Sequence, residues 1–341
     1  MTGQPFSATR LGDCLREGAE RFGWDARKPM GSRREGDWYV GMGMASAARS
    51  NMLVKSAARV RLSAEGAVVE TDMTDIGTGS YAILGQITAE MLGLPVEKVE
   101  VRLGDTSFPG ASGSGGSFGA NSAGSATFLA AKAIRETLAG RMGCSLSELT
   151  LQDGIARGGN REVPLAELVE EEMVEEASIE AGETSESHFS SGFGAHFAEV
   201  AVHAYTGEVR VRRMLGVMAM GRILNEKTAR SQALGGMIWG LGGALTEEMA
   251  HDPRTGHVVT RDLANYHVPA HADVPGDMQV VFLEERDDMA NPIQTKGIGE
   301  LGISGAGAAV LNAVRNACGA RVYDMPATPD KVIAAMEAAG L

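Results

Sequence analysis

The spacing of apolar residues along the chain predicts six helices. Apolar side chains recur at helical spacing after Ser7 and end at Phe22, which predicts an amphipathic helix over residues 8–23. The next predicted helix, over residues 81–92, stops before Gly93, as expected for a glycine beyond a helix terminus. The other four predicted helices lie over residues 122–140, 226–249, 302–317 and 329–338.

Alternating apolar and polar residues predict the strands. Two hairpins are expected, one pairing residues 57–62 with 67–71 and one pairing 197–203 with 208–218. Single strands are expected over 38–48, 99–103 and 278–283. The mixture predicts an α+β (mixed α/β) fold of two similar strand–loop–helix units with hairpins. We expect units over residues 1–156 and 193–341, separated by an acidic linker or insert over 157–192.

Charge alters this picture in one region. The formal net charge of −13 argues against electrostatic binding to nucleic acid, because such binding needs lysine and arginine against phosphates. Ten glutamates and no lysine or arginine lie between Glu162 and Glu186, so this run carries most of the net charge. We interpret the run as a solvated surface insert, with a docking patch for a basic partner as the alternative.

Cysteine usage and apolar run lengths exclude several classes of protein. Cys14, Cys144 and Cys318 lie far apart without a C-x-x-C motif, so neither a disulfide scaffold nor an iron–sulfur or zinc-ribbon protein is expected. No apolar run approaches the ~20 residues of a membrane span, and the N-terminus lacks the pattern of a signal peptide. We expect a cytoplasmic protein, or a periplasmic one if a partner carries the export signal.

Glycine is the compositional outlier. The 45 glycines among 341 residues are close to twice the usual ~7%. They cluster in residues 112–119, 235–243 and 297–302, which indicates backbone that turns tightly or closely approaches something. A glycine inside an exposed helix costs about 1 kcal/mol, so the cluster in the predicted helix over 226–249 indicates close packing or ligand contact.

Residues 297–302 match the dinucleotide-binding fingerprint G-x-G-x-x-G, with Asp324 following at a suitable distance. That fingerprint needs a strand leading into its first glycine, whereas the residues before Gly297 read as a polar loop containing Pro292. Glu300 would also place a carboxylate among the amides meant for pyrophosphate. A Rossmann-type protein binding through Gly297–Gly302 is therefore an alternative only.

Residues 115–119 match G-x-S-x-G, the nucleophile elbow of hydrolases. An elbow needs a buried strand before it, and the glycine- and proline-containing residues 109–113 do not predict one. A flexible surface loop is one alternative. A polar cradle of serines and backbone amides for an anionic cofactor fits the composition better.

Glu300 is the most informative single residue. It lies between glycines in a segment of small apolar residues, which would raise the pKa of its carboxyl group toward the range of a general base. Capping of the following helix is an equal alternative, because helix N-termini favour carboxylates. The seven histidines form no H-E-x-x-H motif, so a metal site built from protein ligands is not expected.

Beyond these patterns, Lys296–Ala306 resembles the catalytic segment in the molybdenum subunit of the xanthine dehydrogenase and aldehyde oxidase family. Three further stretches resemble family segments in the same order: the glycine loop on the pterin at residues 75–81, a second cofactor loop at 112–119, and a helix at 225–240. Residues 324–331 are similar to the family's C-terminus. The bacterial aldehyde-oxidising branch is the most similar.

The resemblance implies an activity and a site. It implies oxidation of an aldehyde to a carboxylate by water-derived oxygen transfer at molybdenum, with Glu300 as the general base. The pterin dithiolene would hold the molybdenum, so the protein would supply no metal ligand, and the cofactor would be molybdopterin cytosine dinucleotide. The implied cofactor-binding residues are Gly77, Thr78, Gly79, Ser114, Gly115, Gly116, Ser117, Phe118, Gly119, Gln232 and Gly299.

The resemblance also implies partners, because the family's N-terminal glycine loop is not found in this sequence. The chain would be a split-gene subunit, a fragment or a truncated reading frame corresponding to the C-terminal half of the molybdenum subunit. Its partners would be the N-terminal half, a subunit with [2Fe-2S] clusters and a subunit with FAD. Hydroxylation of an N-heterocycle is the second substrate class, and a non-catalytic assembly subunit without cofactor is a further alternative.

Overall fold

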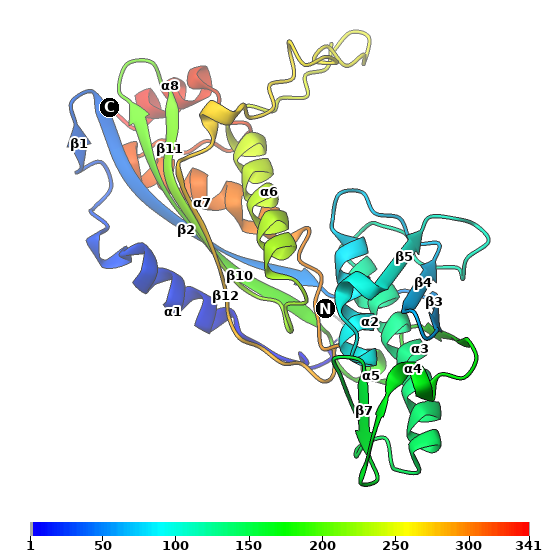
Figure 1. Ribbon diagram of the computed structural model, residues 1–341. Coiled ribbons are helices and arrows are strands. Elements are labelled where there is room, and N and C mark those ends of the chain that lie inside the picture. Colours follow the sequence, from blue (N-terminus) through cyan, green and yellow to red (C-terminus); the bar gives the residue numbers. More distant parts are fainter. Residues whose placement is uncertain (1–2, 341) are drawn as a thin grey trace.

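The computed structural model describes residues 3–340, which form two lobes (Figure 1). The first lobe is built on a five-stranded sheet of order β1-β2-β10-β11-β12. β10 pairs antiparallel with β2 and β11, and β12 pairs parallel with β11. The strands are β1 (Arg34–Glu35), β2 (Trp38–Ser50), β10 (Ser191–His203), β11 (Val209–Ala219) and β12 (Asp277–Phe282).

Helices cover both faces of this sheet. α6 (Glu226–Leu245), α7 (Leu301–Cys318) and α8 (Pro329–Ala338) pack over one face, and α1 (Leu11–Phe22) packs over the other. β10 alternates accordingly: Val200 belongs to the core under α6 and α7, whereas Phe197 belongs to the core under α1. Within residues 3–340, no helix is both long and apolar enough to cross a bilayer.

Glycines allow α7 to lie directly on β2 and on α6. A Cβ atom at Gly43 would lie 2.1 Å from the backbone nitrogen of Ala313 in α7. A Cβ at Gly236 of α6 would lie 2.9 Å from the backbone of Gly302. Gly236 therefore serves close packing of α6 on α7, whereas Gly235 has no neighbouring atom within 4 Å of its Cβ position.

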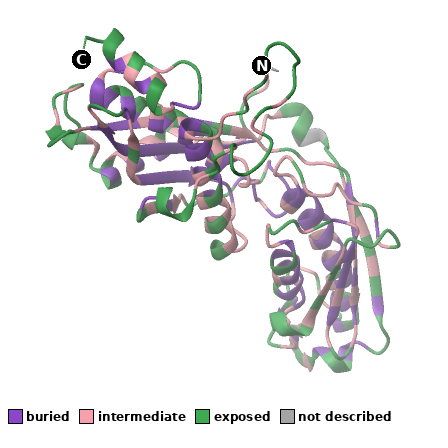
Figure 2. Ribbon diagram, turned by 90° about the horizontal axis from the view of Figure 1, so that it is seen from above, coloured by how far each residue is buried: buried purple, intermediate pink, exposed green. Residues whose placement is uncertain are grey.

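The second lobe is inserted between β2 and β10. Its main sheet has the order β5-β4-β3-β9, and α2 (Ser80–Leu92) and α3 (Gly119–Met142) pack on one face of it. These strands are β3 (Ser56–Leu62), β4 (Ala67–Thr71), β5 (Val99–Leu103) and β9 (Met173–Ile179). Smaller elements are β6 (Thr150–Gln152), β7 (Ile155–Gly158), β8 (Arg161–Pro164), α4 (Leu165–Leu168) and α5 (Glu183–Ser187). Figure 2 shows buried segments inside each lobe.

The lobes do not follow the predicted division into 1–156, 157–192 and 193–341. The chain leaves the first lobe near Asn51 and returns near Ser190, where the Asn51 N–H donates to the Ser190 carbonyl at 2.9 Å. β2 therefore lies in the same sheet as β10, although the predicted boundary separates them. Strand pairing between residues so far apart in the chain produces no local pattern in the sequence. Hydrophobic periodicity depends only on neighbouring positions.

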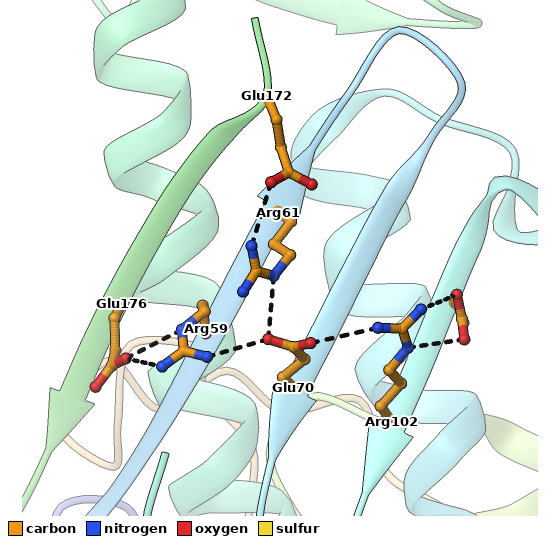
Figure 3. A network of polar contacts seen from close by, with 7 residues as sticks. Arg59, Arg61, Glu70, Arg102, Glu172 and Glu176 are labelled. Carbon is orange, nitrogen blue, oxygen red and sulfur yellow. Dashed lines mark hydrogen bonds and ion pairs between the residues drawn. The ribbon is translucent and has the colours of Figure 1, made fainter. Parts of the chain in front are cut away.

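The acidic run is part of a folded sheet rather than an insert between units. β9 is the edge strand beside β3, and its Glu176 pairs with Arg59 at 2.9 Å. In the same network, Glu70 of β4 contacts three arginines (Figure 3). These are Arg59, Arg61 and Arg102, at 3.2, 3.1 and 3.5 Å. Part of the negative charge is thus matched by arginines of neighbouring strands.

Glu70→Gln is expected to destabilise the protein by about 1–3 kcal/mol, because it removes charge-assisted hydrogen bonds from a carboxylate that is only 5% exposed. Burial would raise the pKa of Glu70, but Arg61 and Arg59 outweigh burial and hold the pKa below its usual value of 4.5. The stabilisation is therefore present above pH 4.5 and is lost as the pH falls through the lowered pKa. Urea unfolding at neutral and acidic pH measures it.

The control is Glu171→Gln, because Glu171 is exposed and has no side-chain partner within residues 3–340. Its free energy of unfolding should equal that of the unchanged protein. Equal stability of the Glu70 and Glu171 variants would contradict a stabilising role of the network.

Candidate functional site

A cavity of about 360 Å³ lies between the two lobes. From the second lobe it is lined by residues of the loop before α2 and of the loop before α3. From the first lobe it is lined by residues 222–225, one side of α6 and residues 295–300. Its volume falls in the range of ~300–1,000 Å³ that is usual for small-molecule and cofactor sites.

The cavity brings together most of the residues that the sequence singled out. Nine of the twelve predicted site residues line it: Thr78, Ser114, Gly115, Gly116, Ser117, Gly119, Gln232, Gly299 and Glu300. The other three, Gly77, Gly79 and Phe118, are chain neighbours of lining residues. Stretches more than 200 residues apart in the chain therefore meet at one cavity.

The carboxylate of Glu300 forms an ion pair with the guanidinium of Arg49, which β2 contributes. Glu300 occupies the residue before α7, but its side chain makes no capping hydrogen bond there. Its surroundings also differ from the small apolar environment that the segment suggests, since the side chain is 41% exposed and contacts a cation. Arg49 is not among the predicted site residues, although it is the single charged residue in Gly41–Ser50.

Ser117 connects the second glycine-rich loop to the segment of Glu300. Its hydroxyl accepts a hydrogen bond from the Glu300 N–H at 2.9 Å, and its φ of 59° is unusual for a residue with a side chain. A Cβ at Gly297 would lie 1.7 Å from the Ser117 carbonyl oxygen, so this contact requires glycine. Residues 104–118 contain no strand, and the nucleophile-elbow interpretation is therefore wrong.

The structure also removes the Rossmann alternative. Thr295 forms only an isolated bridge with Gly221, and no strand leads into Gly297. Gly302, the last glycine of the fingerprint, faces α6, where a Cβ would lie 2.6 Å from the carbonyl oxygen of Ala233. It is glycine because two helices touch there, so the match to the fingerprint is coincidental.

Asp75 organises the first glycine loop. Its carboxylate accepts hydrogen bonds from the N–H groups of Gly77 at 2.7 Å and Thr78 at 2.9 Å, and a longer one from Gly79. Burial would raise the pKa of Asp75, but these N–H donors and that of Tyr81 outweigh burial and lower it. The backbone amides of three implied cofactor-binding residues thus donate to a carboxylate of the chain itself. An aspartate two residues before a glycine is typical of such a turn.

On the opposite wall, Gln232 of α6 lines the cavity with an unengaged amide. Within the part of the chain that the structure describes, this amide has no hydrogen-bond partner. Nearby, Asn225 caps α6 by accepting from the Thr228 N–H at 3.0 Å and donates to Gln86 of α2, also at 3.0 Å. Gln232 is therefore free to bind a polar group inside the cavity.

Behind the cavity, His196 of β10 supports the start of α7. Its Nε2 donates to the Leu301 carbonyl at 3.3 Å, and burial lowers the pKa of the ring to about 4, so His196 is neutral at physiological pH. No group of three or more His, Cys, Asp or Glu side chains in residues 3–340 is arranged to hold a metal ion.

Comparison with known families and proteins assigns the chain to a class. Residues 17–275 match the model of the molybdopterin cofactor-binding domain, and the chain belongs to that family. Over 331 residues it is 50% identical to the aldehyde oxidoreductase molybdenum-binding subunit PaoC of Escherichia coli K12, covering 96% of this chain and 45% of PaoC. Over 340 residues it is 30% identical to the probable hypoxanthine oxidase XdhD of the same strain, covering 96% and 35%. The predicted family is confirmed.

Solved structures confirm the mixed α/β fold class. CO dehydrogenase from Oligotropha carboxidovorans superposes with a TM-score of 0.85 at 19% identity, over 98% of this chain and 46% of that one. The aldehyde oxidoreductase from Desulfovibrio desulfuricans ATCC 27774 superposes with a TM-score of 0.79 at 24% identity, over 98% and 36%. The chain spans about half or less of the length of the relatives that it matches.

The residues at the cavity fit a molybdopterin cofactor. The cofactor brings its own metal ligands, which agrees with a cavity wall that combines apolar side chains with glycines, serines and the free amide of Gln232. A Cβ at Gly299 would lie 3.2 Å from the Ser117 hydroxyl and 3.6 Å from Gln232 Oε1. Glycine at this position therefore leaves space in the cavity beside these two polar side chains.

Proposed function

We propose that the chain is the C-terminal half of the molybdenum subunit of a hydroxylase that oxidises an aldehyde to a carboxylate, with Glu300 as the general base. The main support is the position of the Glu300 carboxylate. It lies at the cavity, forms an ion pair with Arg49 and makes no capping hydrogen bond to α7. The 50% identity to a molybdenum-binding subunit of an aldehyde oxidoreductase supports an aldehyde as the substrate.

The chain's own residues have separate tasks in this proposal. When bound, the cofactor would supply the redox centre for transfer of water-derived oxygen and for two-electron oxidation of the substrate. A carboxylate oxygen of Glu300 accepts a proton from the water that supplies the oxygen, since carboxylates are effective bases when held in place. The Arg49 guanidinium orients that carboxylate through their ion pair, and the Ser117 hydroxyl fixes the backbone at Glu300. Thr78, Gln232 and the loop over residues 114–119 bind the cofactor.

We further propose that the cofactor is molybdopterin cytosine dinucleotide and that the holoenzyme is assembled in the cytoplasm. The partners are the N-terminal half of the molybdenum subunit, an iron–sulfur subunit with [2Fe-2S] clusters and an FAD subunit. Two relatives support a complex of several subunits. One is PaoC, named as a subunit, and the other is the gamma subunit of the 6-hydroxypseudooxynicotine dehydrogenase complex of Paenarthrobacter nicotinovorans, 28% identical over 292 residues.

The purified holoenzyme tests this function. We expect stoichiometric molybdenum, release of cytidine monophosphate on acid hydrolysis, and a kcat/KM for aldehydes at least about 100-fold above that for N-heterocycles. A preference for N-heterocycles would overturn the substrate class. A stable complex with neither molybdenum nor pterin fluorescence would instead identify a non-catalytic assembly subunit.

A further inference from the structure

Lys296 lies immediately before the segment of Glu300 and is buried in an ion triad. Its ammonium nitrogen lies 3.0 Å from Glu285 Oε1 and 3.0 Å from Asp287 Oδ2. The exposed fractions of the three side chains are 0, 2 and 1%. Lys296 therefore cannot touch substrate or cofactor with its charged group, although its residue borders the cavity.

Each carboxylate of the triad has further hydrogen-bond donors. Glu285 Oε2 accepts from the Gly221 N–H at 2.6 Å. Asp287 accepts from the Ser7 hydroxyl at 2.7 Å and from the Met289 N–H at 3.2 Å. The triad thus joins the segment before α1, the residues after β11, the residues after β12 and the segment leading into α7. Four separate stretches of chain are fixed at one place.

Stability alone does not account for such a triad. Removing three charged groups from water is costly, and buried ion groups are often no more stabilising than apolar side chains of similar volume. The geometry of the triad does, however, fix the position of each of its three side chains. The triad holds the side chain of Lys296, while the Lys296 N–H donates to the Met220 carbonyl at 3.0 Å.

The segment between Lys296 and Glu300 needs fixed ends. It contains Gly297 and Gly299, and glycine leaves the backbone many accessible conformations. At one end the triad fixes Lys296, and the Gly297 N–H donates to Asn51 Oδ1 at 3.1 Å. At the other end the Glu300 N–H donates to Ser117. Release of the Lys296 end would let the segment and its carboxylate move.

We propose that Lys296 is a positioning residue and that its triad with Glu285 and Asp287 sets the place of Glu300 in the cavity. The proposal rests on the proposed function of Glu300 as a base. The ammonium acts through the backbone of residues 296–300 and not through contact with the reacting atoms.

The test removes the three charges together, so that no buried charge is left without a partner. In the holoenzyme, Lys296→Met with Glu285→Gln and Asp287→Asn is expected to leave molybdenum content unchanged and KM within about twofold. The kcat should fall at least about tenfold, because small displacements of a catalytic group are costly to rate. Amide hydrogen exchange of residues 295–301, measured on cofactor-free enzyme, should become at least about tenfold faster.

Asp287→Asn alone is the milder variant. It leaves the Lys296–Glu285 ion pair, whose net charge is zero, and it keeps a side-chain oxygen at residue 287 that can accept from the Met289 N–H. Its exchange in residues 295–301 should be intermediate, with a kcat loss of about two- to threefold. The matched control is Glu70→Gln, which weakens an ion network of the other lobe. It should leave both kcat and exchange in residues 295–301 unchanged.

Unchanged kcat and unchanged exchange in the folded triple and single variants would overturn the proposal, since a purely structural triad predicts that result. The exchange measurement also separates this proposal from the assignment of the base. An active Glu300→Gln enzyme would refute Glu300 as the base and leave the exchange result standing. Normal exchange in the triple variant would refute the positioning role and leave the base assignment intact.

Discussion

Replacing Glu300 with glutamine is expected to lower the kcat of the molybdenum-loaded enzyme by about 10²- to 10⁴-fold, the usual contribution of a positioned general base. Glutamine has nearly the same shape but cannot accept the proton. The backbone hydrogen bond from residue 300 to Ser117 is independent of the side chain, so the segment should keep its conformation. Steady-state turnover divided by molybdenum content measures the effect.

Arg49→Gln is the comparison for this variant. It removes the ion pair with Glu300 but leaves the carboxylate, so we expect a smaller loss of about tenfold. The order of the two variants is the informative result. Near-normal turnover of Glu300→Gln at full molybdenum loading would show that another group takes the proton.

The second large effect is expected from Gly43→Ala, which should reduce the free energy of unfolding by about 3 kcal/mol or more. The new methyl group would lie 2.1 Å from the Ala313 nitrogen and 2.3 Å from the Ala309 carbonyl oxygen. Both are backbone atoms of α7, so the clash can be relieved only by moving the whole helix away from β2. Urea unfolding of the purified chain or complex measures the loss.

Gly235→Ala is the matched control. Gly235 lies in α6, and its Cβ position has no neighbouring atom within 4 Å. Alanine there should be neutral or should stabilise the protein by up to about 1 kcal/mol, through its better helix propensity. A loss similar to that of Gly43→Ala would show that crowding at the β2–α7 contact is not the cause.

Local patterns in the sequence predicted the elements well. The helix expected over 81–92 is α2 (Ser80–Leu92), and the helix expected over 329–338 is α8 (Pro329–Ala338). The helix expected to start at 122 begins at Gly119, because the apolar pattern is weak in its small, polar first turn. The helix expected to reach 249 ends at Leu245.

Contacts between residues far apart in the chain could not be predicted from local patterns. That Glu300 meets Arg49 depends on α7 lying across β2, which no spacing along the chain encodes. The buried triad of Lys296 joins residues that individually look like exposed surface charges. Asp75 lay within a recognised loop, but its carboxylate was not expected to use the loop's amides. The family resemblance identified the segments that meet at the cavity, whereas the contacts between them required the fold.

The two chain segments that connect the lobes lie side by side at Asn51 and Ser190. These two segments connect the second lobe to the first, and the cavity lies between the lobes. Across the cavity, side-chain contacts such as Arg222 with Glu90 and Asn225 with Gln86 join the lobes. Within residues 3–340, no sheet contains strands of both lobes. The separation of the lobes at the cavity is therefore set by contacts of side chains and loops rather than by strand pairing.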